Sequence, residues 1–108
     1  MIRHVAVFRW HDGTTAAQVD AVRAGLDRMP VEVPSIRAYA HGPDLCLGEG
    51  RWDYAVVADF DDADGYLAYV DHPAHDEVRR EALSPLVADR GHVQLELGPV
   101  APGDTIDQ

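Results

Sequence analysis

Residues 2–10, IRHVAVFRW, decide the fold that we expect for this chain. Their side chains alternate between two faces, with a period of two and with β-branched and aromatic residues, which is typical of a strand. One face carries Ile2, His4, Ala6, Phe8 and Trp10. The other carries Arg3, Val5, Val7 and Arg9. Because neither face is wholly polar, we expect both faces of the resulting sheet to be covered at least in part.

Three stretches further along the chain favour helices. Thr15 and Gln18 have the spacing of a capping box, and the apolar residues after them predict a helix over residues 16–29 that Pro30 ends. The acidic pair at 61–62 suits the start of a second, short helix, because a helix N-terminus favours negative charge. A third helical stretch is predicted over residues 74–87, after an interruption at His72-Pro73 and with Pro85 weakening its second half.

Three further strands are predicted, over residues 36–41, 52–60 and 92–97. The order β-α-β-β-α-β predicts an α+β, ferredoxin-like fold, in which a four-stranded antiparallel sheet carries its helices on one face. The other sheet face is most simply covered by a second copy, so we predict a homodimer. Residues 1–98 form the expected domain, and residues 99–108 read as a flexible C-terminal tail.

Composition excludes several classes of function. The 108 residues include 19 Asp and Glu against 9 basic residues, and the net charge of −10 disfavours nucleic acids and anionic membranes as partners. All basic residues are Arg, so a lysine Schiff base is excluded. Cys46 is the single cysteine, and neither a secretory signal nor a membrane-spanning apolar run is evident. We therefore expect a cytoplasmic protein.

Five segments together resemble the stress-responsive dimeric α/β-barrel (Dabb) family. They are IRHVAVFRW at the start, GPDL after the second strand, the strand WDYAVVADF, the segment YVDHPAH and the later PLVADR. The resemblance spans residues 1–97 and implies a dimer whose two sheets pack face to face as a barrel. It also implies a pocket between each sheet and its helices.

The resemblance implies a reaction as well. Plant polyketide cyclases of similar plan close a linear chain by an intramolecular aldol reaction, with a Tyr/His pair that corresponds here to Tyr69 and His75. A supporting His of their first strand corresponds to His4. A further His of their third strand falls on Tyr54 here, and this departure puts the identity of the substrate in doubt.

The residues themselves leave two interpretations of the HPAH segment. A neutral His75 near a helix N-terminus can take a proton from an acidic carbon, while the Tyr69 phenol stabilises the oxyanion that develops. Alternatively, the segment is a helix-entry device, with His72 as a polar cap and Pro73 in the first turn. His4, on an apolar face, is either a core histidine or a polar group in an apolar pocket.

Our leading hypothesis is a cofactor-independent cyclase or lyase that acts on an apolar, carbonyl-rich molecule by aldol or Claisen closure. Its predicted catalytic residues are His75, Tyr69 and His4, and its predicted pocket residues are His72, Tyr54, Phe8 and Trp52. The alternatives are a non-catalytic stress-responsive or ligand-binding dimer and a cofactor-free monooxygenase-like barrel.

Metal binding is the rival chemistry. His72 and His75 with Asp71 or Asp76 resemble part of a divalent site, but an HxxH pair without a second ligand pair is a weak signal, so we predict neither metal nor other cofactor. The remaining histidines are expected at the surface: His11, His41 and His92.

Overall fold

The computed structural model describes residues 1–98, and the tail predicted for residues 99–108 lies outside the described residues. The elements in chain order are β1 (Ile2–Trp10), α1 (Ala16–Asp27), α2 (Met29–Glu32), β2 (Ile36–Pro43), β3 (Tyr54–Phe60), α3 (Ala63–Val70), α4 (Pro73–Val78), the π-helix η1 (Arg79–Leu83) and β4 (Val87–Glu96).

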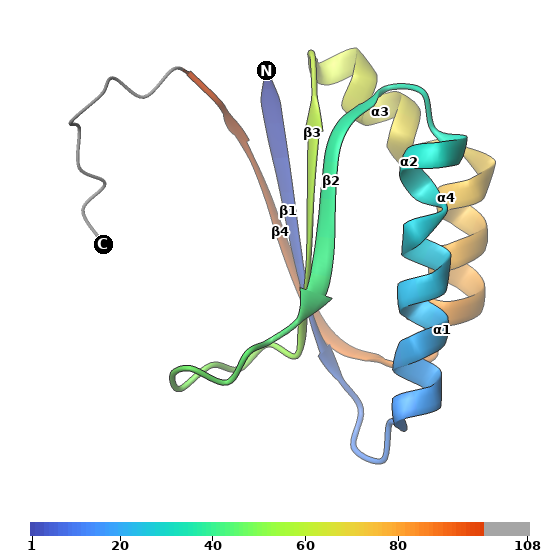
Figure 1. Cartoon of the computed structure of the whole chain (residues 1–108), viewed down its shortest axis with the longest axis vertical. Helices are drawn as coiled ribbons and strands as arrows, with labels where there is room; N and C mark the ends of the chain where they lie inside the picture. Colours follow the sequence, from blue (N-terminus) through green and yellow to red (C-terminus); the bar gives the residue numbers. More distant parts are fainter. Residues whose placement is uncertain (99–108) are drawn as a thin grey trace.

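The four strands form one antiparallel sheet in the order β2-β3-β1-β4, and all helices lie on the same side of it (Figure 1). This confirms the predicted ferredoxin-like α+β fold. The first strand has the predicted bounds, and it lies at the centre because both of its edges are paired. In this register His4 stands between Ala58 of β3 and Gln94 of β4.

The first helix begins as predicted but ends earlier. The Thr15 side chain accepts a hydrogen bond from the Gln18 amide, and the Gln18 side chain accepts one from the Thr15 amide, which completes the capping box. α1 stops at Asp27, and Pro30 lies inside the next short helix, α2, instead of ending a helix. A proline fits there because the first turn of a helix has no intrahelical partner for its N–H groups.

The helical stretch after His72 is shorter than predicted. α4 starts at Pro73, and the chain then widens into the π-helix η1, in which the Ser84 amide donates to the Arg79 carbonyl. Helix ends before Pro85, and β4 starts at Val87, five residues before the predicted start at His92. Of the residues in this earlier part of the strand, only Val87 lies within the predicted helix, and residues 88–91 were predicted to belong to neither element.

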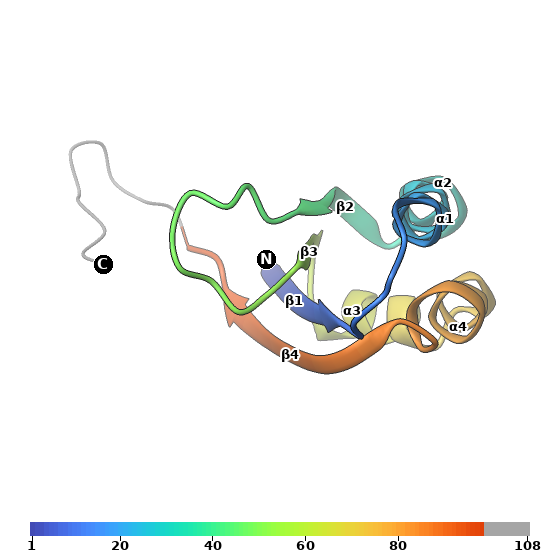
Figure 2. The same ribbon diagram turned by 90° about the horizontal axis from the view of Figure 1, so that it is seen from below.

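The core fills the space between the sheet and the helices. α1 and α4 lie side by side over the sheet (Figure 2). Their close approach depends on Gly25, where a Cβ would lie 3.1 Å from Val78 Cγ1. The buried core side chains include Ala6, Phe8, Val22, Leu26, Met29, Val33, Val56, Ala58, Phe60, Tyr69, Val78 and Leu83.

The opposite face of the sheet is covered by no helix of the described chain (Figure 1). It is largely apolar: Val93 and Leu95 of β4 are 56% and 44% exposed, and Val5, Val7 and Val57 lie beside them. A bidentate ion pair from Arg3 to Asp59, at 2.8 and 2.9 Å, crosses this face and holds the Asp59 pKa below its usual value. The apolar surface therefore extends across this face from the central strands β3 and β1 to the edge strand β4.

Candidate active site

A cavity of about 340 Å³ opens between the sheet and the segment formed by α3, α4 and η1. A smaller, more enclosed cavity of about 50 Å³ shares six of its lining residues and reaches the core residues Leu26 and Met29. The residues common to both are His4, Ala6, Phe8, Tyr69, His75 and Leu83. The walls are therefore mostly apolar, with a few convergent polar groups, which is how small-molecule sites are usually built.

The structure brings Tyr69 of α3 and His75 of α4 together in this cavity. Their ring centroids are 4.6 Å apart, with the planes inclined at 61°. The Nδ1 atom of His75 is buried and has no hydrogen-bond partner among the described residues. A buried polar atom without a partner costs about 1–3 kcal/mol, so such atoms are uncommon away from functional sites.

The surroundings of His75 favour the neutral imidazole. Burial lowers the pKa of His75, and the positive charge of Arg79 lowers it further, whereas the Val70 backbone and Asp76 act in the opposite direction. Because the net effect is a pKa below the usual value, His75 is unprotonated at neutral pH. It can therefore accept a proton.

Tyr69 is held by a second tyrosine. Its phenol oxygen lies 3.1 Å from the phenol oxygen of Tyr39 on β2. Burial raises the pKa of both phenols, so both keep their protons at neutral pH. When Tyr39 donates in this pair, the Tyr69 O–H is free to donate to a ligand.

His4 is 8% exposed and lines the same cavity from the centre of the sheet. Burial and the nearby His92 and His75 lower the pKa of His4 to about 4. The side-chain amide nitrogen of Gln94 lies 2.8 Å from Nδ1 of His4. Since an amide N–H₂ group only donates, Nδ1 accepts and the proton of the neutral ring lies on Nε2. His4 is thus a neutral hydrogen-bond donor, a different role from that of His75.

Of the predicted pocket residues, Phe8 lines the cavity, whereas three others lie elsewhere. His72 caps α4, because its Nδ1 accepts a hydrogen bond of 3.1 Å from the Ala74 amide. Tyr54 is buried in the core and bonds to His41. Trp52 lies on the helix-free face beside Gly91, and the Arg51 guanidinium stacks 5.1 Å from its ring centroid.

The prediction that His41 is a surface residue is wrong. Its side chain is only 10% exposed, with Nδ1 2.6 Å from the Tyr54 phenol oxygen and Nε2 2.7 Å from Asp27. The alternation of β2 places His41 on the helix-covered face, opposite Val56 of β3. His92 is exposed, but it lines the cavity mouth instead of pointing away from it.

The cavity also has lining residues that were not predicted from the sequence, among them the polar side chains of Tyr66, Arg79 and Arg90. Arg90 pairs with Phe8 across β4 and β1, and so lies on the same face as Phe8. A prediction that started β4 at Val87 would have included Arg90 in the strand and placed it on this face.

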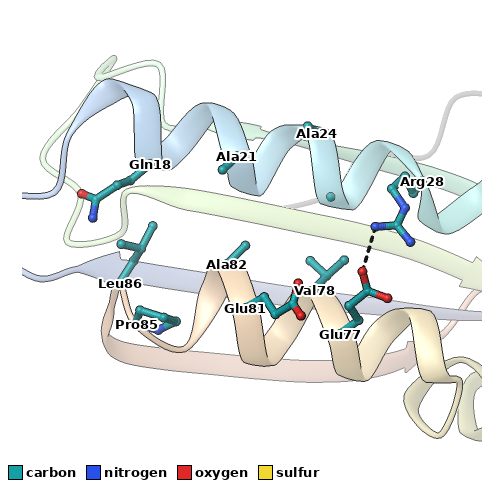
Figure 3. Close-up of a pocket in the computed structure, with 11 residues that line it drawn as sticks. Gln18, Ala21, Ala24, Arg28, Glu77, Val78, Glu81, Ala82, Pro85 and Leu86 are labelled. Atoms are coloured by element: carbon teal, nitrogen blue, oxygen red, sulfur yellow. Dashed lines mark hydrogen bonds and ion pairs between the residues drawn. The ribbon is translucent and has the colours of Figure 1, made fainter.

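A larger hollow, of about 510 Å³, lies between α1 and the α4–η1 segment (Figure 3). Small residues such as Ala21 and Ala24 line it, and an exposed ion pair of 3.3 Å between Arg28 and Glu77 spans it. Its Gln18 side chain is already used in the capping box. Because its polar groups are paired or solvated, the His/Tyr cavity is the better candidate for chemistry.

Two properties of residues 1–98 bear on other functions. No three His, Cys, Asp or Glu side chains in this range are placed so that they could hold a metal ion. In the same range, no helix has the length and apolar character needed to cross a membrane.

The chain belongs to the stress-responsive A/B barrel domain family, whose profile matches residues 2–96. This confirms the resemblance seen in the sequence. An uncharacterized protein of Streptomyces coelicolor is 29% identical over 98 residues, which cover 82% of this chain and 97% of that protein.

Solved structures show the same fold. A dimeric ferredoxin-like protein of unknown function from Thermobifida fusca is 46% identical, covers 89% of this chain and 90% of its own, and superposes with a TM-score of 0.82. The hydroxynitrile lyase of Passiflora edulis is 17% identical, with 94% and 96% coverage and a TM-score of 0.80, a likeness of fold alone.

Proposed function

We propose that this protein is a cofactor-independent enzyme that closes a carbonyl-rich, polyketide-like chain by an aldol-type reaction, with His75 as the general base. One observation carries the proposal: a neutral His75 with an unpartnered buried nitrogen lies against Tyr69, in the same cavity as the donor His4. The apolar walls suit the hydrocarbon part of such a chain.

The reaction needs only proton transfer and positioning. His75 takes a proton from a carbon between two carbonyl groups, and the electron pair that is left spreads onto a carbonyl oxygen as an enolate. The Tyr69 O–H donates to that oxygen. The enolate carbon then attacks a second carbonyl of the same chain, where His4 Nε2–H donates to the developing alkoxide. The protonated His75 returns its proton to this alkoxide, so the ring product is an isomer of the substrate.

The cavity shape contributes by folding the chain into a reactive pose, since holding two reacting groups together removes much of the entropic barrier. Phe8 and Leu83 are among the apolar residues that line the same cavity as these polar groups.

The proposed working unit is a homodimer. The apolar, helix-free face of the sheet supports it, and the similar Thermobifida fusca protein is described as dimeric. A second copy of this face would cover the exposed Val93 and Leu95, which lie at its β4 edge.

The test is turnover of a linear poly-β-ketone probe, followed by chromatography of the cyclised product. The His75→Gln variant is expected to lose at least about 100-fold in turnover, the usual contribution of a general base. The matched control is His41→Gln, which changes the other tyrosine-bonded histidine and is expected to retain turnover. Equal turnover by His75→Gln and wild type contradicts the proposal. Probe binding without turnover by the wild type supports a ligand-binding protein instead.

A further inference from the structure

The mouth of the cavity differs in charge from the rest of the molecule. The chain has 19 Asp and Glu against 9 Arg, yet no carboxylate from residues 1–98 lines the cavity. Two arginines and a histidine stand at its exposed side instead: Arg79, Arg90 and His92. A positive opening on an acidic protein attracts and retains anions that the remaining surface repels.

Arg90 differs from Arg79 in its pairing with carboxylates of the described residues. Most arginines of the chain are paired with carboxylates within residues 1–98, namely Arg3, Arg28, Arg37, Arg51, Arg79 and Arg80. Arg90 makes no ion pair with any described residue. The neighbouring Arg79 is held by Asp76 at 2.7 Å, so its charge is partly neutralised and its position is fixed.

The polar groups of the cavity are arranged in a sequence along the sheet. On the helix-covered side of β4, Arg90 stands opposite Phe8, His92 opposite Ala6 and Gln94 opposite His4. Gln94 lies four positions after Arg90 along the strand, a backbone span of about 13 Å. A molecule that lies along this side therefore meets the Arg90 guanidinium at one end and the His4–Tyr69–His75 group at the other, with the apolar Phe8 and Ala6 of β1 and the His92 side chain along the way.

We propose that the cavity selects a substrate with a terminal carboxylate, bound by Arg90 with support from Arg79, so that the substrate class is a keto acid. The planar guanidinium matches a carboxylate with two parallel hydrogen bonds, and it fixes orientation as well as position. The apolar chain then extends over Phe8 and Leu83 and places its carbonyl groups beside His4 and His75. The inference deepens the proposed function, because it uses the same cavity.

The experiment compares two unreactive probes of equal length, octanoate and octanamide, by NMR titration of the ¹⁵N-labelled full chain. We expect the wild type to bind octanoate at least about tenfold more tightly, the order expected for a charge-assisted hydrogen bond. Arg90→Gln is expected to remove this preference and leave octanamide binding unchanged. Added salt is expected to weaken octanoate binding alone, since salt screens exposed charges.

The matched control is Arg23→Gln, because Arg23 is also exposed and makes no ion pair within residues 1–98, but lies on α1 and does not line the cavity. It is expected to bind both probes like the wild type. Equal affinity of the wild type for the two probes, an equal loss in Arg23→Gln, or no saturable octanoate binding overturns the carboxylate site. Carboxylate-selective binding without any cyclisation supports this site and contradicts the catalytic proposal, so the two failures are distinguishable.

Discussion

Two histidine–tyrosine pairs lie on the helix-covered side of the sheet, and they differ in how many of their polar atoms form hydrogen bonds. In the His41–Tyr54 pair every polar atom has a partner, because His41 bonds to the Tyr54 phenol with one nitrogen and to Asp27 with the other. In the His75–Tyr69 pair the rings touch, but the buried Nδ1 of His75 has no partner in the described chain. The residue types are the same, and the hydrogen bonds decide which pair is available to a ligand.

The comparison assigns different work to the two pairs. His41 and Tyr54, which we call the closed pair, connect α1 to β2 and β3, and their hydrogen bonds contribute to stability. His75 and Tyr69, which we call the open pair, line a cavity. In our proposal the unpartnered nitrogen of His75 bonds to a substrate. A buried polar network with all its bonds satisfied rigidifies a core, whereas a partly satisfied one marks a place where something else binds.

The strongest test of the comparison removes one phenol oxygen at a time. Tyr69→Phe is expected to lower kcat on the poly-β-ketone probe by about 100-fold, the usual cost of losing one oxyanion donor. Tyr54→Phe, the same change in the closed pair, is expected to leave kcat unaltered. Steady-state kinetics of both variants provides the measurement, and a similar fall in kcat for Tyr54→Phe removes the distinction.

A smaller effect, on the free energy of unfolding, is expected when the pH is lowered. His4 lines the same cavity as His75 and Tyr69 and has no carboxylate partner within residues 1–98, and its folded pKa of about 4 lies below the usual 6.5. The unfolded chain therefore binds a proton at this residue first. The contribution of His4 to the free energy of unfolding is constant above pH 6.5, where the ring is neutral in both states. As the pH decreases to about 4, the free energy of unfolding falls by about 2 kcal/mol, a value reduced to allow for solvent at the cavity mouth.

Urea denaturation of the wild type and of His4→Gln across this pH range checks the expectation, because the contributions of groups that do not interact with His4 cancel in the difference. Parallel pH profiles for the two proteins show that His4 is protonated as easily in the fold as outside it, which contradicts the lowered pKa.

The smallest effect separates the pairs by stability. Tyr54→Phe leaves His41 Nδ1 without its partner, and we expect the free energy of unfolding to fall by about 1.5 kcal/mol. His75→Leu removes no hydrogen bond at Nδ1 and keeps a similar side-chain volume, but it loses the contact with the Val70 backbone, so a smaller fall than for Tyr54→Phe is expected. Chemical denaturation at neutral pH measures both. A larger loss for His75→Leu indicates that His75 is a structural residue.

Sequence patterns predicted much of the fold because the signals that fix it are local. The alternation of residues 2–10, the Thr15–Gln18 capping box and the Asp62 and His72 caps all act within a few residues of chain, and the structure has each of them. The location of the Tyr69–His75 pair also depended on one short segment. Its catalytic role stays a prediction.

The closed pair could not be predicted in the same way. His41 is 14 residues from Asp27 and 13 from Tyr54, and the three meet only through the β2–β3 register and the position of α1 on the sheet. Arg90 was missed because its side depends on where β4 begins. Long-range packing and strand register set both arrangements, and neither leaves a short-range pattern.

The π-helix η1 has a consequence for how this site can change in evolution. Val78 and Leu83, five residues apart, are both buried and line the same small cavity, whereas five residues of regular α-helix turn through about 500° and point in divergent directions. The wide turn absorbs the equivalent of one inserted residue within its own length. A single-residue deletion between Arg79 and Leu83 would tighten it to an ordinary helix and replace the side chains on this wall, while the strands on either side kept their register. Deletion of a single codon can thus change the shape of the cavity during evolution while the sheet stays the same.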